Sequence, residues 1–228
     1  MANLCIIPAR GGSKRIPRKN IKAFLGKPIL AYSIEAALES NLFCEVMVST
    51  DDIQIAELAS QYGANVPFYR SEKTSDDYAT TFDVLDEVLT NYQNSGKRFD
   101  NLCCLYPCAP FVNSQKIRTA FKTLCEGSFE TVIPVVAYSF PIQRSFFIRD
   151  NKLSYKYPEF EKSRSQDLEK MYHDTGQFYW CKVNSLINNR GIMNQNTGFL
   201  ELTELEIQDI DNKVDWQLAE LKYKLLNQ

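Results

Sequence analysis

Ile7-Pro-Ala-Arg-Gly-Gly-Ser-Lys-Arg-Ile-Pro-Arg-Lys-Asn-Ile-Lys22 is the most informative segment of this sequence. It begins at the end of the apolar run Leu4–Ile7, which is typical of a buried strand. Gly11 and Gly12 allow the backbone to approach a ligand closely, and Pro17 disfavours a helix through the segment. The pattern predicts a loop that follows directly after a strand.

This loop, called the basic loop (residues 10–22) below, concentrates positive charge. It contains six cations and no acid: Arg10, Lys14, Arg15, Arg18, Lys19 and Lys22. Two like charges about 4 Å apart repel by roughly 4 kcal/mol near a protein surface, so the loop favours an anionic ligand such as a nucleoside triphosphate. Backbone N–H groups of Gly11, Gly12 and Ser13 are suited to an anion nest. The alternative is a solvated basic loop or a nucleic-acid patch. The loop has neither the P-loop nor the dinucleotide-binding glycine pattern.

Strand-like and helix-like segments alternate over the first 137 residues. Such alternation predicts a three-layer α/β fold with a mostly parallel sheet, and ligands of such sheets bind beyond the carboxyl ends of the strands. The segments Ser49–Asp52, Arg70–Thr81 and Pro107–Phe111 each follow a predicted strand, so we expect them to converge with the basic loop on one cleft. Asn65–Tyr69 is predicted as a further strand.

Composition limits the possible classes of protein. The 228 residues include 44% hydrophobic residues, enough for a sizeable core, and the net charge of −2 does not favour nucleic acid or an anionic membrane as partner. We expect no membrane span and, without a signal peptide, a cytoplasmic location. Seven cysteines without a C-x-x-C pair indicate buried free thiols in a reducing compartment rather than a zinc site.

The regular alternation stops between residues 138 and 172. Proline, aromatic and charged residues are mixed there, and Asp150-Asn151 predicts a hairpin turn. We interpret this segment as a β-rich arm inserted into a single domain that spans residues 1–228. Exposed aromatic residues in such an arm are typical of an interface.

A pair of carboxylates near the C-terminus forms a second candidate site. Asp209 and Asp211 are separated by one residue, so in an extended segment they point the same way. Two such carboxylates can hold Mg²⁺. The alternative is that Asp211 caps the final helix, in which we expect Val214, Leu218, Leu221 and Leu225 to face inward.

Pro8-Ala-Arg-Gly-Gly-Ser-Lys-Arg-Ile-Pro-Arg-Lys-Asn20 resembles the signature of the CMP-sialic acid synthetases, and Asp209-Ile-Asp-x-x-x-Asp-Trp216 resembles their C-terminal metal motif. The resemblance implies a Rossmann-like nucleotidyltransferase fold related to the glycosyltransferase-A fold, with a dimerisation arm that completes the partner's site. It implies attack of a keto-sugar acid hydroxyl on the α-phosphate of CTP, assisted by Mg²⁺. Arg10, Lys19 and Asp211 are expected to be catalytic. The expected nucleotide contacts are Arg10, Gly11, Gly12, Ser13, Lys14, Lys19, Asn20, Arg70, Ala79 and Thr81, and the expected metal ligands are Asp209 and Asp211.

Departures from the sialate pattern lie in the predicted sugar pocket. Tyr106 stands where sialate enzymes have glutamine, and His173-Asp174 and Gln177-Phe178 resemble the pseudaminic acid branch. The expected sugar contacts are Tyr106, Gln143, Arg144, Arg164, His173, Asp174, Gln177 and Phe178. For His173 a binding role is preferred to that of general base, because metal-assisted deprotonation needs no histidine.

These features predict a homodimeric cytidylyltransferase that makes CMP-pseudaminic acid from CTP and pseudaminic acid. Within the class, the alternatives are sialic acid, legionaminic acid or a shorter keto-sugar acid as acceptor. Outside it, they are a glycosyltransferase, which would release no pyrophosphate from CTP, and a CTP-binding regulator, which would tolerate loss of Asp209 and Asp211.

Overall fold

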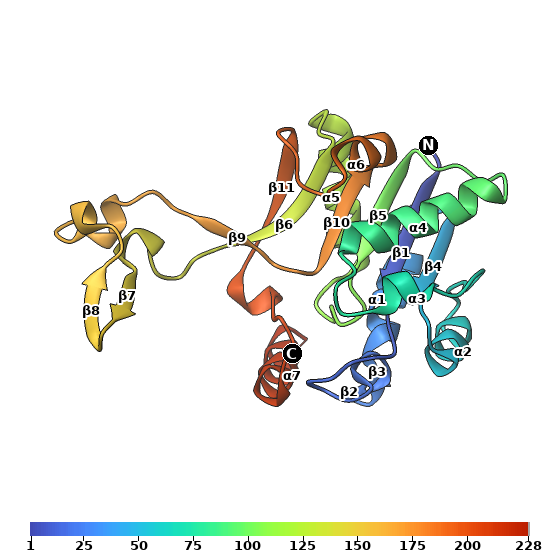
Figure 1. Cartoon of the computed structure of the whole chain (residues 1–228), viewed down its shortest axis with the longest axis horizontal. Helices are drawn as coiled ribbons and strands as arrows, with labels where there is room; N and C mark the ends of the chain where they lie inside the picture. The colour runs from blue at the N-terminus through green and yellow to red at the C-terminus, as the bar shows by residue number, and fades with distance from the viewer. Residues whose placement is uncertain (228) are drawn as a thin grey trace.

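A seven-stranded mixed sheet forms the centre of the molecule in the computed structural model, which describes residues 1–227 (Figure 1). The strand order is β11-β6-β10-β5-β1-β4, and β9 pairs with the outer part of β6. Strand β1 runs parallel to β4 and β5, β11 runs parallel to β6, and β10 is antiparallel to both neighbours. The bounds are β1 (Asn3–Pro8), β4 (Glu45–Ser49), β5 (Asn101–Leu105), β6 (Thr131–Ala137), β9 (Tyr172–Asp174), β10 (Phe178–Lys182) and β11 (Thr197–Leu202).

Helices cover both faces of this sheet. This arrangement is needed because β1 presents apolar side chains on both faces. Cys5 and Ile7 belong to a buried cluster with α1 (Ile29–Ser40), α2 (Ile53–Gln61) and α5 (Ser114–Glu126). Leu4 and Ile6 belong to a second cluster, with α4 (Thr81–Asn94) and α6 (Val183–Asn189). Successive strand residues point to opposite faces, so β1 is apolar on both. The predicted three-layer α/β fold is confirmed.

The segment predicted as a strand at Asn65–Tyr69 is not one. It makes a single bridge, between Met47 and Asn65, and then runs as irregular chain to the short helix α3 (Glu72–Ser75). Pro67 lies in its middle and has no N–H to donate to a ladder. The segment therefore behaves as an edge connection.

The inserted segment projects from the sheet as a separate arm (Figure 1). It carries the hairpin of β7 (Phe146–Arg149) and β8 (Lys152–Tyr155), together with short 3₁₀ turns at Ile142–Arg144, Pro158–Phe160 and Ser165–Asp167. Asp150 and Asn151 have φ values of 50° and 56°, as the tight turns that match strand twist require. The predicted hairpin turn is confirmed.

The final helix α7 (Lys213–Leu226) packs by a different face from the one predicted. Trp216 and Ala219 are buried, and the Trp216 ring packs edge-on against Phe24, in the short strand β2 (Ala23–Phe24) that pairs with β3 (Lys27–Pro28). The prediction that four aliphatic residues face inward is wrong, because the helix packs through Trp216 and Ala219 on the apolar cluster of Ile16, Phe24, Ile29, Phe111 and Ile210. Val214, Leu218, Leu221 and Leu225 are 44–62% exposed. No helix within residues 1–227 has the length and apolarity to cross a bilayer.

Candidate active site

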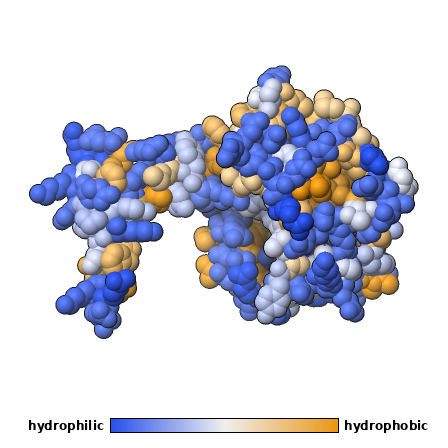
Figure 2. All heavy atoms as spheres, turned by 45° about the horizontal axis from the view of Figure 1, so that its top comes forward, coloured by the Kyte–Doolittle hydropathy of each residue, from blue (hydrophilic) through white to orange (hydrophobic). Residues whose placement is uncertain are grey.

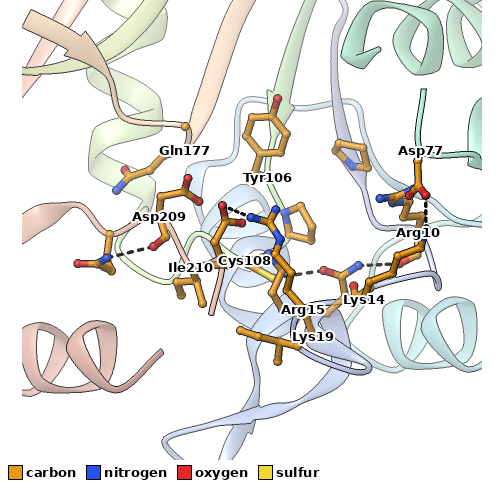
Figure 3. A pocket seen from close by; sticks show the side chains of 18 of the residues that line it. Arg10, Lys14, Arg15, Lys19, Asp77, Tyr106, Cys108, Gln177, Asp209 and Ile210 are labelled. Carbon is orange, nitrogen blue, oxygen red and sulfur yellow. Dashed lines mark hydrogen bonds and ion pairs between the residues drawn. The ribbon is translucent and has the colours of Figure 1, made fainter. Parts of the chain in front are cut away.

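A cleft of about 660 Å³ opens at the carboxyl ends of β1 and β5 (Figure 3). Strand β10 is antiparallel to β5, so the chain entering β10 reaches the same edge of the sheet. The lining residues come from the basic loop, the chain between α3 and α4, the chain after β5, the start of β10 with the turn before it, and the segment before α7. They include Arg10, Ser13, Lys14, Arg15, Lys19, Asn20, Asp77, Tyr106, Cys108, Gly176, Gln177, Tyr179, Gln208, Asp209 and Asp211.

The four loops predicted to converge do so through specific bonds. The Gly11 N–H donates to Asp51 Oδ1 (2.8 Å), and Arg10 Nη1 donates to Asp77 Oδ1 (2.8 Å). Asn20, buried, donates from Nδ2 to the Arg10 carbonyl (2.9 Å) and accepts from Cys108 Sγ (3.2 Å). The basic loop, Arg70–Thr81 and Pro107–Phe111 each contribute lining residues, whereas Ser49–Asp52 only contacts the basic loop, so the prediction of a common cleft is confirmed for three of the four segments.

The six cations of the basic loop are all partnered within the chain. Arg10 and Lys14 pair with Asp77, Arg15 with Asp211 (2.6 Å), and Arg18 with Asp52 (2.5 Å). Lys19 Nζ donates to the Ile210 carbonyl (2.7 Å), and Lys22 lies over the Trp216 ring at 4.3 Å. Carboxylates of the chain therefore supply counter-charges to four of the six cations, which relieves the repulsion expected from the sequence.

The Arg18–Asp52 pair stabilises the start of α2. Asp52 Oδ1 caps α2 by accepting from the N–H groups of Gln54 and Ile55, and the Arg18 guanidinium holds the pKa of Asp52 below its usual value. Neither residue lines the cleft.

Some predicted nucleotide contacts are engaged in the protein instead. The Ser13 N–H donates to the Gly11 carbonyl (3.0 Å), so together with the Gly11–Asp51 bond two of the three predicted nest donors are already used. Arg70 donates to Ser49 Oγ and to the Ser49 carbonyl (2.9 Å), which ties its loop to the end of β4. Gly11, Gly12, Arg70, Ala79 and Thr81 do not line the cleft, although Thr81 Oγ1 lies 2.9 Å from the hydroxyl of Tyr106, which does.

Asp209 and Asp211 both line the cleft, and Figure 3 shows Asp209 on the side away from Arg10 and Asp77. Partial burial and the neighbouring Asp211 carboxylate raise the pKa of Asp209. The cap of α7 is Asn212, whose side chain accepts from the N–H groups of Val214 (2.8 Å) and Asp215 (3.1 Å). Asp211 therefore does not cap α7. No group of three or more metal-binding side chains occurs among residues 1–227, but two carboxylates on one cleft wall fit a hard cation that is also bound by phosphates.

The predicted sugar contacts separate into three groups. Tyr106 and Gln177 line the cleft. His173 and Asp174 line an adjoining cavity of about 420 Å³ that shares Gly176, Gln208 and Asp209 with the cleft. Asp174 is held in place because it accepts from the Gly176 N–H (2.8 Å) and the Tyr179 hydroxyl (2.5 Å).

The remaining predicted sugar contacts do not reach this cleft. Gln143, Arg144 and Arg164 lie in the arm, where Gln143 is buried and donates to the Glu169 carbonyl (2.8 Å). Phe178 is 0% exposed in the core cluster between the sheet and α1, α2 and α5. Its prediction as a sugar contact is wrong, because β10 alternates and Phe178 points into the core.

Sequence reasoning missed several lining residues. Asp77, Cys108 and Tyr179 stand beside residues that were predicted, and the strand period would have placed Tyr179 on the same face of β10 as Gln177. Lys222, from α7, lines the adjoining cavity and donates to the carbonyls of Glu204 and Ile207. Nothing in the sequence around Lys222 indicates this position.

A family model described as cytidylyltransferase matches residues 4–179. The chain is 42% identical over 226 residues to a pseudaminic acid cytidylyltransferase of Campylobacter jejuni subsp. jejuni serotype O:2, covering 99% of this chain and 97% of that protein. It is 35% identical over 237 residues to a CMP-N,N'-diacetyllegionaminic acid synthase of Legionella pneumophila, covering 100% and 98%.

Among solved structures, the fold is similar to that of a CMP:2-keto-3-deoxy-manno-octonic acid synthetase complexed with CTP. The TM-score is 0.71 at 17% sequence identity, covering 100% of this chain and 99% of the other. At that identity the similarity establishes the fold, which agrees with the nucleotidyltransferase architecture predicted from the basic loop and the alternating elements.

Proposed function

This chain belongs to the cytidylyltransferase family, and from that premise we propose that it transfers CMP from CTP to the anomeric hydroxyl of pseudaminic acid, releasing pyrophosphate. The observation that carries the proposal is the placement of Arg10, Lys14, Arg15 and Lys19 on the same cleft as the carboxylates of Asp209 and Asp211. The 42% identity to a pseudaminic acid cytidylyltransferase over nearly the full chain supports the choice of acceptor.

The basic loop would bind the triphosphate. Arg10, at the tip of β1, offers a guanidinium that matches phosphate oxygens in a bidentate fashion, and Lys19 would hold the leaving pyrophosphate. Most of the catalytic effect in such a transfer comes from positioning and from neutralising charge that develops on phosphate oxygens. Arg18, committed to the cap of α2, would fix the loop rather than bind CTP.

Mg²⁺ would be held by Asp209 and Asp211, and when bound it would supply positive charge to the phosphate oxygens and acidify the attacking hydroxyl. Lys19 already neutralises part of the negative charge beside this pair, since its ammonium contacts the intervening Ile210 carbonyl. Arg15 pairs with Asp211 in the present structure (2.6 Å) and would have to release this carboxylate to the metal.

The acceptor would lie on the side of the cleft formed by Tyr106, Gln177 and Tyr179. These residues present two phenol rings packed edge-on, 5.6 Å apart, and the face of an aromatic ring suits the methyl groups of a di-N-acylated sugar. Tyr179 is bonded to Asp174 and Tyr106 to Thr81, so the ring positions are fixed before the sugar binds.

A homodimer is proposed as the active form. Apolar side chains are exposed on the hairpin (Phe146, Ile148 and Leu153) and on α7, and Figure 2 shows open space between the arm and the body, with hydrophobic surface on both sides. A two-stranded hairpin is at best marginally stable by itself, so a second copy that packs against it would stabilise the arm. Arg144 and Arg164 would then serve the site of the partner. A cytoplasmic location is proposed, where CTP is available.

Pyrophosphate release with CTP and a panel of acceptors tests the proposal. Pseudaminic acid is expected to react with the highest kcat/KM, and N,N'-diacetyllegionaminic acid, the acid named in the 35% identical relative, is the second candidate. Release with N-acetylneuraminic acid alone would refute the acceptor assignment, and no release with any nonulosonic acid would refute the activity.

A further inference from the structure

The Asp77 carboxylate lies between two cations of the cleft wall. Its Oδ1 accepts from Arg10 Nη1 at 2.8 Å, and its Oδ2 accepts from Lys14 Nζ. Arg10 Nη1 also donates to the Asp76 carbonyl (2.9 Å). All three side chains line the cleft, and Figure 3 shows Arg10, Lys14 and Asp77 gathered on the wall opposite Asp209. One carboxylate thus pairs with two of the candidate phosphate ligands, Arg10 and Lys14.

This contact differs from the other ion pairs of the basic loop. Asp52, the partner of Arg18, also caps α2, and Asp211, the partner of Arg15, belongs to the carboxylate pair. Within residues 1–227, the side chain of Asp77 has hydrogen-bond partners only in Arg10 and Lys14. No element of secondary structure depends on it, so the carboxylate can leave without breaking the fold.

The energetics favour exchange of this carboxylate for phosphate. The side chains of Arg10 and Asp77 are 36% and 43% exposed, and that of Lys14 is 77% exposed. Ion pairs at this exposure contribute little and are screened by salt. A triphosphate as a whole carries more negative charge and more acceptor oxygens than one carboxylate, so it competes well for the same two cations.

We propose that Asp77 is a displaceable counter-anion, which pairs with Arg10 and Lys14 and is displaced from them by the triphosphate of the nucleotide. The inference rests on the proposed function, in which these cations bind CTP. Asp77 is a positioning residue that competes with the substrate.

The displacement couples phosphate binding to the rest of the nucleotide site. Asp76 Oδ1 accepts from the N–H groups of Tyr78 (2.9 Å) and Ala79 (2.7 Å), which makes residues 76–79 a tight turn. Arg10 holds both the Asp77 carboxylate and the Asp76 carbonyl of this turn, so its release by phosphate would free the turn to shift, and Ala79 with it. Ala79 is one of the predicted nucleotide contacts that do not line the cleft in this structure.

The test is the variant Asp77→Asn, which keeps the shape of the side chain and removes its charge. Isothermal titration with inorganic tripolyphosphate, which has neither base nor ribose, is expected to give a Kd about fivefold lower than for the wild type at the same salt concentration. In the steady state, the KM for CTP should fall and inhibition by pyrophosphate should strengthen. Glu57→Gln, an exposed charge removal on α2, is the matched control and should bind tripolyphosphate as the wild type does.

The outcomes separate this inference from the proposed function. A wild type that releases no pyrophosphate from CTP refutes the function, whatever Asp77 does. If the wild type is active and Asp77→Asn binds tripolyphosphate equally or more weakly, Asp77 does not compete with phosphate and the inference is refuted. Asp77→Glu, which retains the charge, should restore the wild-type Kd; if it binds as tightly as Asp77→Asn, the charge is not the cause.

Discussion

Arg10 combines a position at the tip of β1 with a guanidinium that is free to exchange partners. Replacing it by alanine should reduce kcat/KM for CTP by about 100-fold, the loss typical for one donor to developing oxyanion charge. The fold should survive, because the Arg10 side chain is 36% exposed and its hydrogen-bond partners, Asp76 and Asp77, lie in an exposed turn. Pyrophosphate release and a thermal melt measure the two effects. A variant with near-normal turnover would remove Arg10 from the phosphate site.

The ionised carboxylate of Asp209 is expected to destabilise the folded protein. A carboxyl group whose pKa is raised in the folded protein, as that of Asp209 is, favours unfolding once ionised. This penalty is absent well below the unfolded pKa and complete above the folded one. In metal-free buffer at neutral pH, Asp209→Asn should therefore melt at a slightly higher temperature than the wild type, and the difference should vanish as the pH falls below both pKa values.

The same substitution should raise the Mg²⁺ concentration needed for half-maximal activity, because Asn is a weaker ligand than a carboxylate. Asp211→Asn should do likewise. Asn212→Ala is the contrasting variant, since it should cost roughly 1 kcal/mol of stability by removing the cap of α7 and leave the metal titration unchanged. Magnesium titrations of Asp209→Asn and Asp211→Asn that both match the wild type would show that these carboxylates do not hold the metal.

At the level of elements, the docking of the basic loop on α2 depends on Gly11. A Cβ at Gly11 would lie 2.8 Å from Asp52 Oδ2 and 2.9 Å from Asp52 Cβ, whereas a Cβ at Gly12 would meet nothing within 4 Å. Gly11→Ala should therefore displace Asp52 from the α2 cap and lower the melting temperature by about 5 °C. Gly12→Ala should melt as the wild type does. Equal melting temperatures for the two variants would show that the loop adjusts without cost.

The elements show what the sequence could and could not predict. The basic loop and the strand before it were predictable because each signal is local: a continuous apolar run, two glycines and a dense charge. The inward face of α7 was not, because Val214, Leu218, Leu221 and Leu225 form an apolar stripe at helical spacing that is nevertheless exposed. Periodicity identifies an apolar face but not what covers it. Likewise, nothing in the local sequence of the arm indicates whether its residues contribute to the site of their own chain or to that of a partner.

At the scale of the whole molecule, the arm and the exposed stripe of α7 are explained together if two copies associate. In a twofold-symmetric dimer each surface is buried twice. The molar mass measured by light scattering should be twice 26.2 kDa. Ile148 is 76% exposed in one copy, and a charge there, as in Ile148→Asp, should shift the protein towards the monomer. Met193→Asp is the control, because Met193 is also exposed (63%) but lies outside the arm and α7. A wild type that is monomeric at micromolar concentration would contradict the dimer.

If the arm completes the site of the partner, activity should be recoverable by mixing two impaired subunits. Arg10→Ala disables the cleft of its own chain, and the double variant Arg144→Ala/Arg164→Ala disables the arm. In a mixed dimer, one site combines an intact cleft with an intact arm from the other subunit, and the second site combines both defects. Random exchange at equal concentrations makes about half of all dimers mixed, so about a quarter of wild-type activity should return. An arm that serves its own chain would give mixed dimers with two defective sites, and mixing would restore nothing.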